Sequence, residues 1–173
     1  MKLLSWSLVP VVMACSAVVY AANIDNVGAD REALVARGNY LVSIMDCTGC
    51  HTAGALRGAP DPQRFLAGSD IGFGTPQAIV YPPNLTPDVD TGLGRWSDAE
   101  VVAAITSGQR PDGRMLSPVM PWPSYARLSS DDARAVVAYL RTIPAVSFAA
   151  PTPVMAGSDI TFPYMTLAMP ASK

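Results

Sequence analysis

The stretch Cys47-Thr48-Gly49-Cys50-His51 decides how the rest of this 173-residue chain is interpreted. The pattern C-x-x-C-H is typical of covalent haem attachment. Two thiols one helical turn apart can add to the two vinyl groups of the porphyrin, and the histidine that follows then lies under the iron as its proximal ligand. The motif therefore predicts one covalently bound haem c, held by Cys47, Cys50 and His51.

Other uses of this motif fit the sequence less well. A structural zinc site needs four Cys or His ligands, whereas the chain has three Cys and one His, and Cys15 lies in an N-terminal apolar segment. A thioredoxin-like redox pair requires a preceding strand, whereas the residues before Cys47 have helical periodicity. A plain disulfide between Cys47 and Cys50 would leave His51 without a role.

The composition favours one small, loop-rich domain with extensions. The chain contains 16 Pro and 13 Gly, and only 15% of its residues are charged. Its formal net charge of −2 gives no support to nucleic-acid binding, so we expect no nucleic-acid partner.

Residues 1–21 have the features of a cleaved signal peptide. Lys2 supplies the positive charge, an apolar run follows, and Val19-Tyr20-Ala21 has the small-residue spacing of a cleavage site. An uncleaved membrane anchor and a lipoprotein processed at Cys15 are the alternatives. All three export the chain, so we expect it in the periplasm, and an anchor would attach residues 1–22 to the inner membrane.

The first predicted helix leads into the haem motif. Residues 22–34 form a lead-in and the start of this helix, and apolar residues recur at helical spacing over residues 31–45. Gly38 costs about 1 kcal/mol relative to Ala inside a helix, so it indicates a close approach by another helix. We expect Tyr40 to pack on the same side and Tyr139 to cross there.

Two further helices carry clear boundary signals. Ser97 and Glu100 form a capping box, and Gly108 is a natural end for the helix that follows. A third helix begins at Ser129 or Ser130, where acidic residues favour the helix N-terminus. The fold class is therefore predicted as small and all-α, with three main helices around the haem.

Residues 52–95 are rich in Gly and Pro and predict a long loop, with a short hairpin around residues 79–81. A structureless loop of this length is uncommon unless something organises it. The apolar face of a covalently held haem would give this loop a surface to cover.

The iron needs a sixth ligand or stays open to added ligands. His51 is the only histidine in the chain, so a methionine thioether is the leading candidate. Met120 lies between Pro118 and Pro121, which hold the backbone extended and stiff. Met115 is the competing choice, but it follows a Gly-Arg turn and lacks this proline frame.

Together these features resemble a class I cytochrome c. Residues 84–88 (NLTPD), 91–98 (TGLGRWSD) and 118–121 (PVMP) more closely resemble the cytochrome c subunits of bacterial membrane-bound dehydrogenases for alcohols, aldehydes and sugar acids such as gluconate. The resemblance implies a cytochrome c domain over residues 35–145, followed by a Pro-rich tail over residues 146–173. It also implies Met120 as the axial ligand. Many such subunits carry three haem domains, whereas this chain has one haem motif.

The sequence thus predicts an exported monohaem electron carrier that is not itself an enzyme. We expect a dehydrogenase subunit as donor and a cytochrome, an oxidase or a quinone pathway as acceptor. Arg95 and Trp96 are candidate donors to the haem propionates, and the tail either wraps the domain or docks to a partner. A peroxidase-like enzyme and a ligand-binding haem module are the alternatives, and both need the open sixth position that the Met120 loop argues against.

Overall fold

The computed structural model describes residues 11–155 and 157–168, with residues 11–27 described by their backbone alone. The predicted signal peptide therefore lies partly outside the described residues, and residues 11–21 are helical. Residues 22–30, expected to lead into the first helix, are helical as well. Among the described residues, no helix is both long and apolar enough to cross a membrane.

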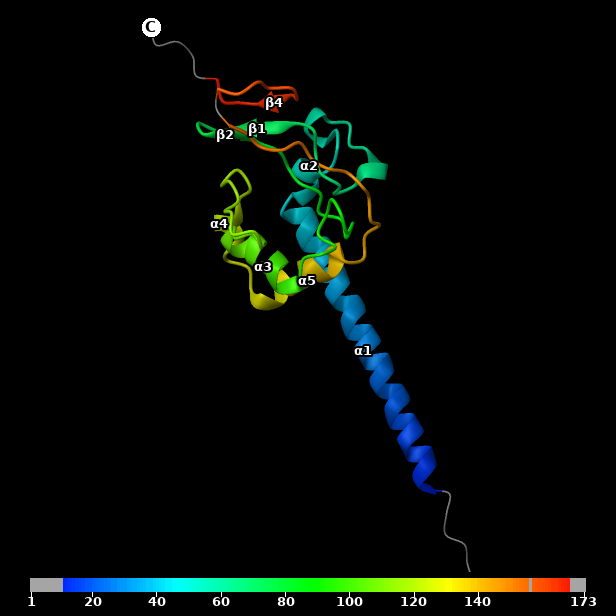
Figure 1. The fold of residues 1–173 in the computed structure, drawn as a ribbon. Helices are drawn as coiled ribbons and strands as arrows, with labels where there is room; N and C mark the ends of the chain where they lie inside the picture. The colour runs from blue at the N-terminus through cyan, green and yellow to red at the C-terminus, as the bar shows by residue number, and fades with distance from the viewer. Residues whose placement is uncertain (1–10, 156, 169–173) are drawn as a thin grey trace, which may run out of the picture.

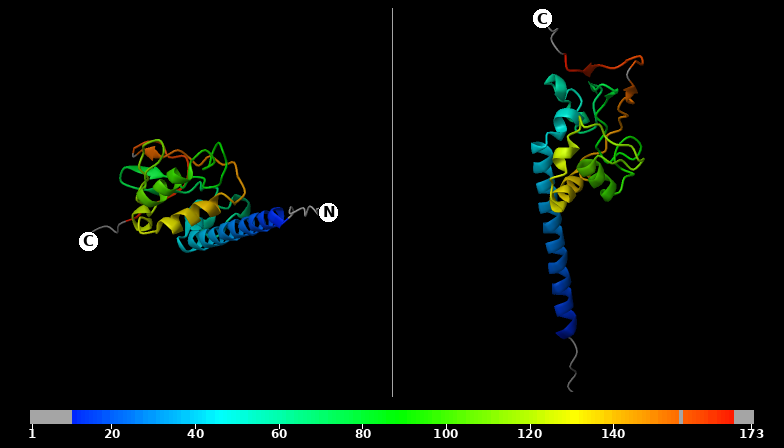
Figure 2. Two further views of the ribbon diagram at one scale, coloured as in Figure 1. Left: turned by 90° about the horizontal axis from the view of Figure 1, so that it is seen from below. Right: turned by 90° about the vertical axis from the view of Figure 1, so that its left-hand side faces the viewer.

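Three longer helices form the frame, as predicted: α1 (Val11–Ile44), α3 (Asp98–Ser107) and α5 (Ser130–Leu140). The haem motif forms the short α2 (Cys47–His51), and α4 (Trp122–Tyr125) precedes α5. Two short 3-10 turns, Ala55–Arg57 and Pro62–Arg64, follow α2. The first half of α1 extends away from the other elements, and its second half lies along α5 (Figures 1 and 2).

The contact between α1 and α5 is very close at Gly38. A Cβ atom at this position would lie 1.9 Å from the backbone oxygen of Ala135 and 2.7 Å from Cβ of Tyr139. The predicted crossing of these helices is therefore confirmed. The expectation that Tyr40 packs on the same side is wrong, because two residues correspond to about 200° of helix rotation. The Tyr40 residue is instead 55% exposed.

The predicted helix boundaries are also confirmed. The Ser97 hydroxyl accepts a hydrogen bond from the Glu100 amide at 3.3 Å, and the Glu100 carboxylate accepts one from the Ser97 amide at 2.7 Å. Gly108 ends α3 with φ 72°, in the left-handed region that favours glycine. Ser129 caps α5 by accepting a hydrogen bond from the Asp132 amide at 3.1 Å.

The all-α expectation is incomplete, because a small four-stranded sheet covers one end of the domain (Figure 1). Its order is β3-β2-β1-β4, with the antiparallel pairs β1–β2 and β2–β3 and the parallel pair β1–β4. The strands are β1 (Gly72–Gly74), β2 (Ala78–Val80), β3 (Val154–Met155) and β4 (Tyr164–Met165). Strands of two or three residues are too short to show an alternating pattern, so the sequence predicted only the hairpin.

The C-terminal segment wraps the domain as far as it is described. Besides supplying β3 and β4, it is tied to the loop of Asn84, whose side-chain nitrogen donates to the Val146 carbonyl at 2.7 Å. The Arg64 guanidinium lies over the ring of Phe148, 3.9 Å from its centroid. These contacts hold the long loop against the C-terminal segment. The helical core is formed by residues such as Leu41, Val101 and Val136.

Candidate haem-binding site

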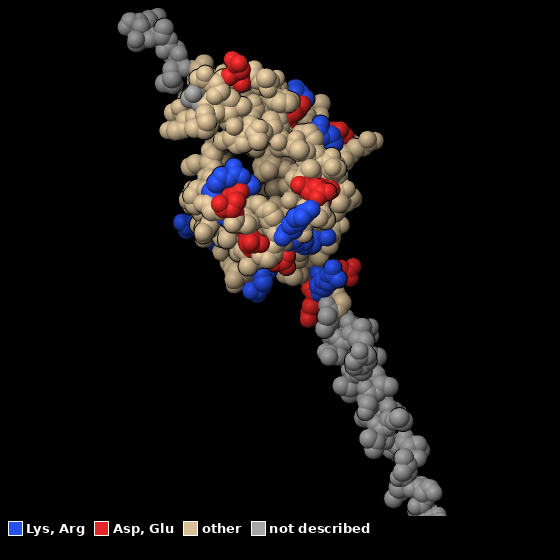
Figure 3. Space-filling model, in the orientation of Figure 1, with Lys and Arg blue, Asp and Glu red and all other residues tan. Residues whose placement is uncertain are grey.

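An apolar cavity of about 1120 Å³, open solvent at its mouth included, lies among α2, the β1–β2 hairpin, α3, α5 and the loop that carries Met120. Figure 3 shows a hollow in this face of the molecule, with charged side chains on both sides of it. Cys47, Cys50, His51 and Met120 all line the cavity, although Met120 is about 70 residues from the others in sequence. The structure thus brings the four predicted ligands of haem and iron to one place.

The local fold explains the spacing of the haem motif. Asp46 adopts a left-handed conformation, with φ 53°, which turns the chain from the end of α1 into α2. Its carboxylate folds back over the helix, so a Cβ atom at Gly49 would lie 2.4 Å from the Asp46 Oδ2 atom. Glycine at this position therefore leaves room for the Asp46 carboxylate beside α2, whose Cys47, Cys50 and His51 line the cavity.

His51 is held in the state that a metal ligand requires. Its Nδ1 atom lies 2.7 Å from the Pro83 carbonyl, which can only accept, so Nδ1 carries the proton and Nε2 keeps its lone pair. The residue is 8% exposed. Burial lowers the pKa of the imidazole, with the Pro83 hydrogen bond opposing it. A neutral, oriented imidazole is thus available as an axial ligand.

The two cysteines have the properties of buried thiols. Both are free. Burial raises the pKa of the Cys47 thiol to about 11, and it also raises the pKa of the Cys50 thiol. A redox-active pair of the thioredoxin type needs a lowered pKa instead. Within the described residues, no group of three or more His, Cys, Asp or Glu side chains is placed to hold a metal ion.

The loop before α4 presents Met120 and leaves Met115 outside. The Met120 amide donates to the Ser117 carbonyl at 3.0 Å, and the Trp122 amide donates to the Met120 carbonyl at 2.7 Å. Met115 is 58% exposed and lies outside the cavity lining. Met45 does line the cavity, and sequence reasoning overlooked it. It directly follows α1, two residues before Cys47, and lacks the proline frame of Met120.

The structure separates the two residues predicted to contact haem propionates. Trp96 lines the cavity, whereas Arg95 does not. The Arg95 side chain is 69% exposed, and it binds the Val89 carbonyl and the Asp90 carboxylate of its own loop. Its proposed role stays a prediction, and Arg110, which sequence reasoning missed, lines the cavity in its place.

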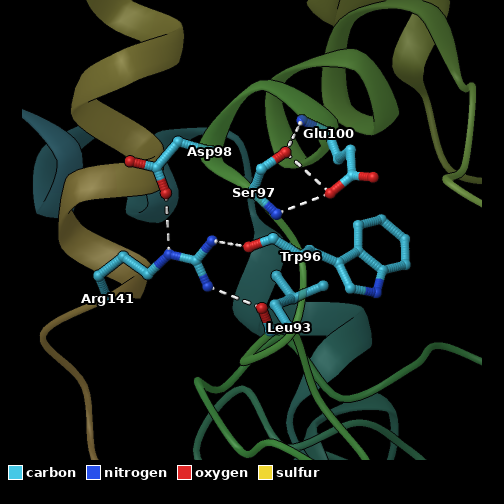
Figure 4. A network of polar contacts seen from close by, with 6 residues as sticks. All are labelled: Leu93, Trp96, Ser97, Asp98, Glu100 and Arg141. Carbon is cyan, nitrogen blue, oxygen red and sulfur yellow. Dashed lines mark hydrogen bonds and ion pairs between the residues drawn. The ribbon is translucent and has the colours of Figure 1, made fainter.

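Arg141 holds the segment that carries Trp96 against α5 (Figure 4). Its two terminal nitrogens donate to the carbonyls of Leu93 at 2.7 Å and Trp96 at 2.5 Å. Its Nε atom donates to the Asp98 carboxylate at 3.0 Å. One guanidinium therefore joins the end of α5, the start of α3 and one wall of the cavity.

Sequence reasoning also missed three aromatic residues of the cavity wall: Phe73, Tyr81 and Tyr125. The Tyr125 hydroxyl donates to the Met45 carbonyl at 2.7 Å, which ties α4 to the end of α1. Burial raises the pKa of Tyr125 to about 12. These residues are scattered over loops and short elements, where no periodic signal could have found them.

The comparison with known proteins agrees with this geometry. The family model described as "Cytochrome c" matches residues 35–144. The chain belongs to the cytochrome c family.

Several curated relatives of this cytochrome c are subunits of dehydrogenases, and another is a diheme c-type cytochrome. The chain is 40% identical over 108 residues to the cytochrome c subunit of alcohol dehydrogenase (quinone) from Gluconobacter oxydans, covering 62% of this chain and 21% of that one. Identity is 38% over 109 residues, 63% of this chain and 23% of the relative, for the gluconate 2-dehydrogenase cytochrome c subunit of Pantoea cypripedii. It is 36% over 108 residues, 62% and 21%, for the fructose dehydrogenase cytochrome subunit of Gluconobacter japonicus. The chain thus spans about a fifth of these relatives' length.

The family implies a covalent haem c, and the residues of the cavity fit this group. Apolar side chains form most of the wall, as an extended aromatic ring requires. Two thiols, one neutral imidazole and one thioether reach the cavity. When bound, haem supplies a couple between ferrous and ferric iron that exchanges one electron. The chain's own residues orient the imidazole and supply the apolar wall around it.

Proposed function

We propose that this chain carries single electrons on one haem c, which is bound to Cys47 and Cys50 and ligated by His51 and Met120. The observation that carries the proposal is that these four side chains line one apolar cavity. A single C-x-x-C-H motif supports one haem. A neutral thioether as second axial ligand favours the ferrous state and therefore raises the reduction potential.

The proposed redox partners follow from the relatives. The alcohol, gluconate and fructose dehydrogenase relatives are all cytochrome subunits. We infer that this chain likewise accepts electrons from a dehydrogenase subunit and passes them to a cytochrome, an oxidase or a quinone pathway. It is a carrier rather than the catalytic subunit. In this proposal the cavity binds haem, and the substrate is oxidised on the dehydrogenase subunit.

Export is part of the same proposal. Residues 1–21 have the features of a signal peptide, and c-type haem attachment takes place outside the cytoplasm. We place the protein in the periplasm, with an uncleaved inner-membrane anchor as the alternative. Intact mass tests this step: loss of residues 1–21 supports cleavage, and a retained segment in the membrane fraction supports the anchor.

Two measurements on the purified protein test the carrier function. Acid–acetone extraction leaves the haem colour with the polypeptide if thioether bonds hold the haem, and removes it otherwise. We expect the ferrous protein not to bind carbon monoxide rapidly, because the proposed ligands His51 and Met120 fill both axial positions of the iron. Rapid carbon monoxide binding together with peroxide turnover would support the rival function, a peroxidase-like enzyme or ligand-binding module with an open sixth position.

A further inference from the structure

Two cavities of different character meet at one side of the site. The large cavity is mainly apolar, whereas a neighbouring pocket of about 530 Å³, open solvent included, is bordered by the polar side chains of Asn84 and Thr91 and by the Asp90 carboxylate, which is paired with Arg95 at 2.7 Å. Trp96 and Arg110 are part of both linings. A ligand that is apolar over most of its area and anionic along one edge would fit this arrangement.

The Arg110 side chain is placed to meet such an anionic edge. It is 24% exposed, and its guanidinium carbon lies 5.3 Å from the centroid of the Trp96 ring. Its Nε atom makes a long contact of 3.3 Å to the Asp112 carboxylate. Within the described residues, its two terminal nitrogens donate no hydrogen bond to the protein. They are therefore available to a ligand.

Asp112 does not compete strongly for Arg110. The same carboxylate accepts hydrogen bonds from Arg114 at 2.7 and 3.0 Å. Those bonds, together with one from the Arg114 backbone amide, hold the pKa of Asp112 well below its usual range. Asp112 thus orients Arg110 through the Nε contact, while Arg114 compensates most of the negative charge of Asp112.

Arg110 also stands alone as a cation at the cavity. Among the described residues that line the large cavity, the charged side chains are Arg110 and Asp46, and Asp46 lies beside Cys47 at the attachment motif. A buried or half-buried carboxylate needs a cationic partner, and a guanidinium meets it with two parallel hydrogen bonds.

We propose that Arg110 binds a haem carboxylate where the two cavities meet and thereby raises the reduction potential. The inference rests on the proposed function, because it requires haem in the large cavity. A haem is an apolar ring with two carboxylates along one edge, which matches an apolar cavity that opens beside a polar pocket. A positive charge held near the iron stabilises the ferrous state, which carries one positive charge fewer than the ferric state.

The test compares reduction potentials of holoprotein variants. Arg110→Gln and Arg110→Met both remove the charge, and Met keeps a long apolar side chain at the cavity wall, so one variant remains informative if the other fails to load haem. At a fixed applied potential we expect either variant to shift the ferrous-to-ferric ratio toward ferric by about tenfold, the effect of one charge roughly 10 Å away at an effective dielectric constant of ~20. Arg110→Lys should restore most of the ratio.

Two other arginines provide the comparison. Arg134→Gln removes an equal charge from the exposed side of α5, where Arg134 pairs with Asp131, and should leave the ratio unchanged. Arg95→Gln tests the residue that the sequence favoured. The proposal is overturned if both neutral Arg110 variants behave like Arg134→Gln, or if Arg95→Gln gives the larger shift. Failure of the proposed function looks different, because the unmutated protein would then lack covalent haem or bind carbon monoxide.

Discussion

The contact between α1 and α5 and the haem-site cavity are both lined by apolar side chains, yet they are filled in opposite ways. At the helix contact there is no space for one methyl group, because a Cβ atom at Gly38 would lie 1.9 Å from the Ala135 oxygen. On the other side, Val136 and Leu140 of the same helix α5 line the large apolar cavity, whose volume is about 1120 Å³ with open solvent included. Helix α5 thus contributes both to the tightly packed core and to the wall of the cavity proposed to hold haem.

The difference indicates where each half obtains its stability. The helical frame is held by side-chain packing and helix caps, which the chain supplies itself. The long loop contributes Leu66 and Leu93 to the same core, but much of it is held by hydrogen bonds such as that of Asn84 to Val146 and, in the proposed holoprotein, by the haem. We therefore expect changes at the haem motif to affect the loops first, and changes at the helix contact to affect global unfolding.

The largest effect should follow from breaking haem attachment. Cys47→Ser or Cys50→Ser removes one thioether bond, so most of the holoprotein should be lost, as measured by the ratio of haem absorbance to protein. Amide hydrogen exchange should rise in residues 52–95 and 109–121 before it rises in α1 and α5.

Thr48→Ser is the matched control, since it alters the same motif without touching a predicted attachment point, and it should load haem normally. Full haem content in Cys50→Ser, with exchange rates like those of the parent, would contradict the proposed attachment.

Next in size is a change at the helix contact. Gly38→Ala forces α1 and α5 apart, because the new methyl meets backbone and not a flexible side chain, and should lower the free energy of unfolding by about 3 kcal/mol. Gly28→Ala is the matched change on the same helix, where nothing lies within 4 Å, and should be neutral or stabilise by up to ~1 kcal/mol. Urea unfolding of the holoproteins measures both. Equal effects of the two substitutions would show that the close contact is not the cause.

A smaller effect is expected at Arg141, which connects the frame to the cavity wall. Arg141→Gln removes its donors to the Leu93 and Trp96 carbonyls and should cost about 2 kcal/mol of unfolding free energy. Arg134→Gln breaks only an exposed pair and should change the unfolding free energy by less than ~0.5 kcal/mol. Thermal unfolding should show a larger loss of stability for Arg141→Gln than for Arg134→Gln. The reverse result would show that Arg141 does not stabilise the cavity wall.

The smallest effect should be a pH-dependent one at the outer edge of the helix contact. Arg37 donates to the Asp132 carboxylate at 2.8 Å, and this hydrogen bond lowers the pKa of Asp132 from 3.8. A lowered folded-state pKa contributes stability above the unfolded pKa of about 4, and this contribution is lost as pH falls through the folded value. Asp132→Asn should therefore be slightly less stable than the parent at pH 7, and the difference should shrink as the pH falls below about 4. A difference that stays constant as the pH is lowered through this range would exclude this ion pair as its source.

Local sequence signals predicted the frame well. Gly38, the Ser97–Glu100 capping box and Gly108 each act on neighbouring backbone or on a single helix contact, so their effect can be inferred from the chain alone. The attachment motif and the proline frame of Met120 also predicted residues that the structure brings to one cavity.

The rest depends on contacts that the sequence does not encode locally. Strands β3 and β4 have two residues each and pair with β2 and β1 across more than 70 residues of chain. Arg95 and Trp96 were both predicted to contact the haem propionates, but only Trp96 lines the cavity, because neighbouring residues in a loop point in different directions. Arg110 reaches the cavity because Gly108 ends α3 and the bridge between Gln109 and Met115 turns the chain back.

The central claim is that Met120 completes the iron site that the haem motif begins. The most direct test is the weak absorption band at the red end of the oxidised spectrum, which marks a bond between iron and a methionine sulfur. The account predicts that Met120→Ala abolishes this band, lowers the reduction potential and admits carbon monoxide, whereas Met115→Ala and Met45→Leu retain the band. Loss of the band in Met115→Ala or Met45→Leu, with its persistence in Met120→Ala, would contradict the account.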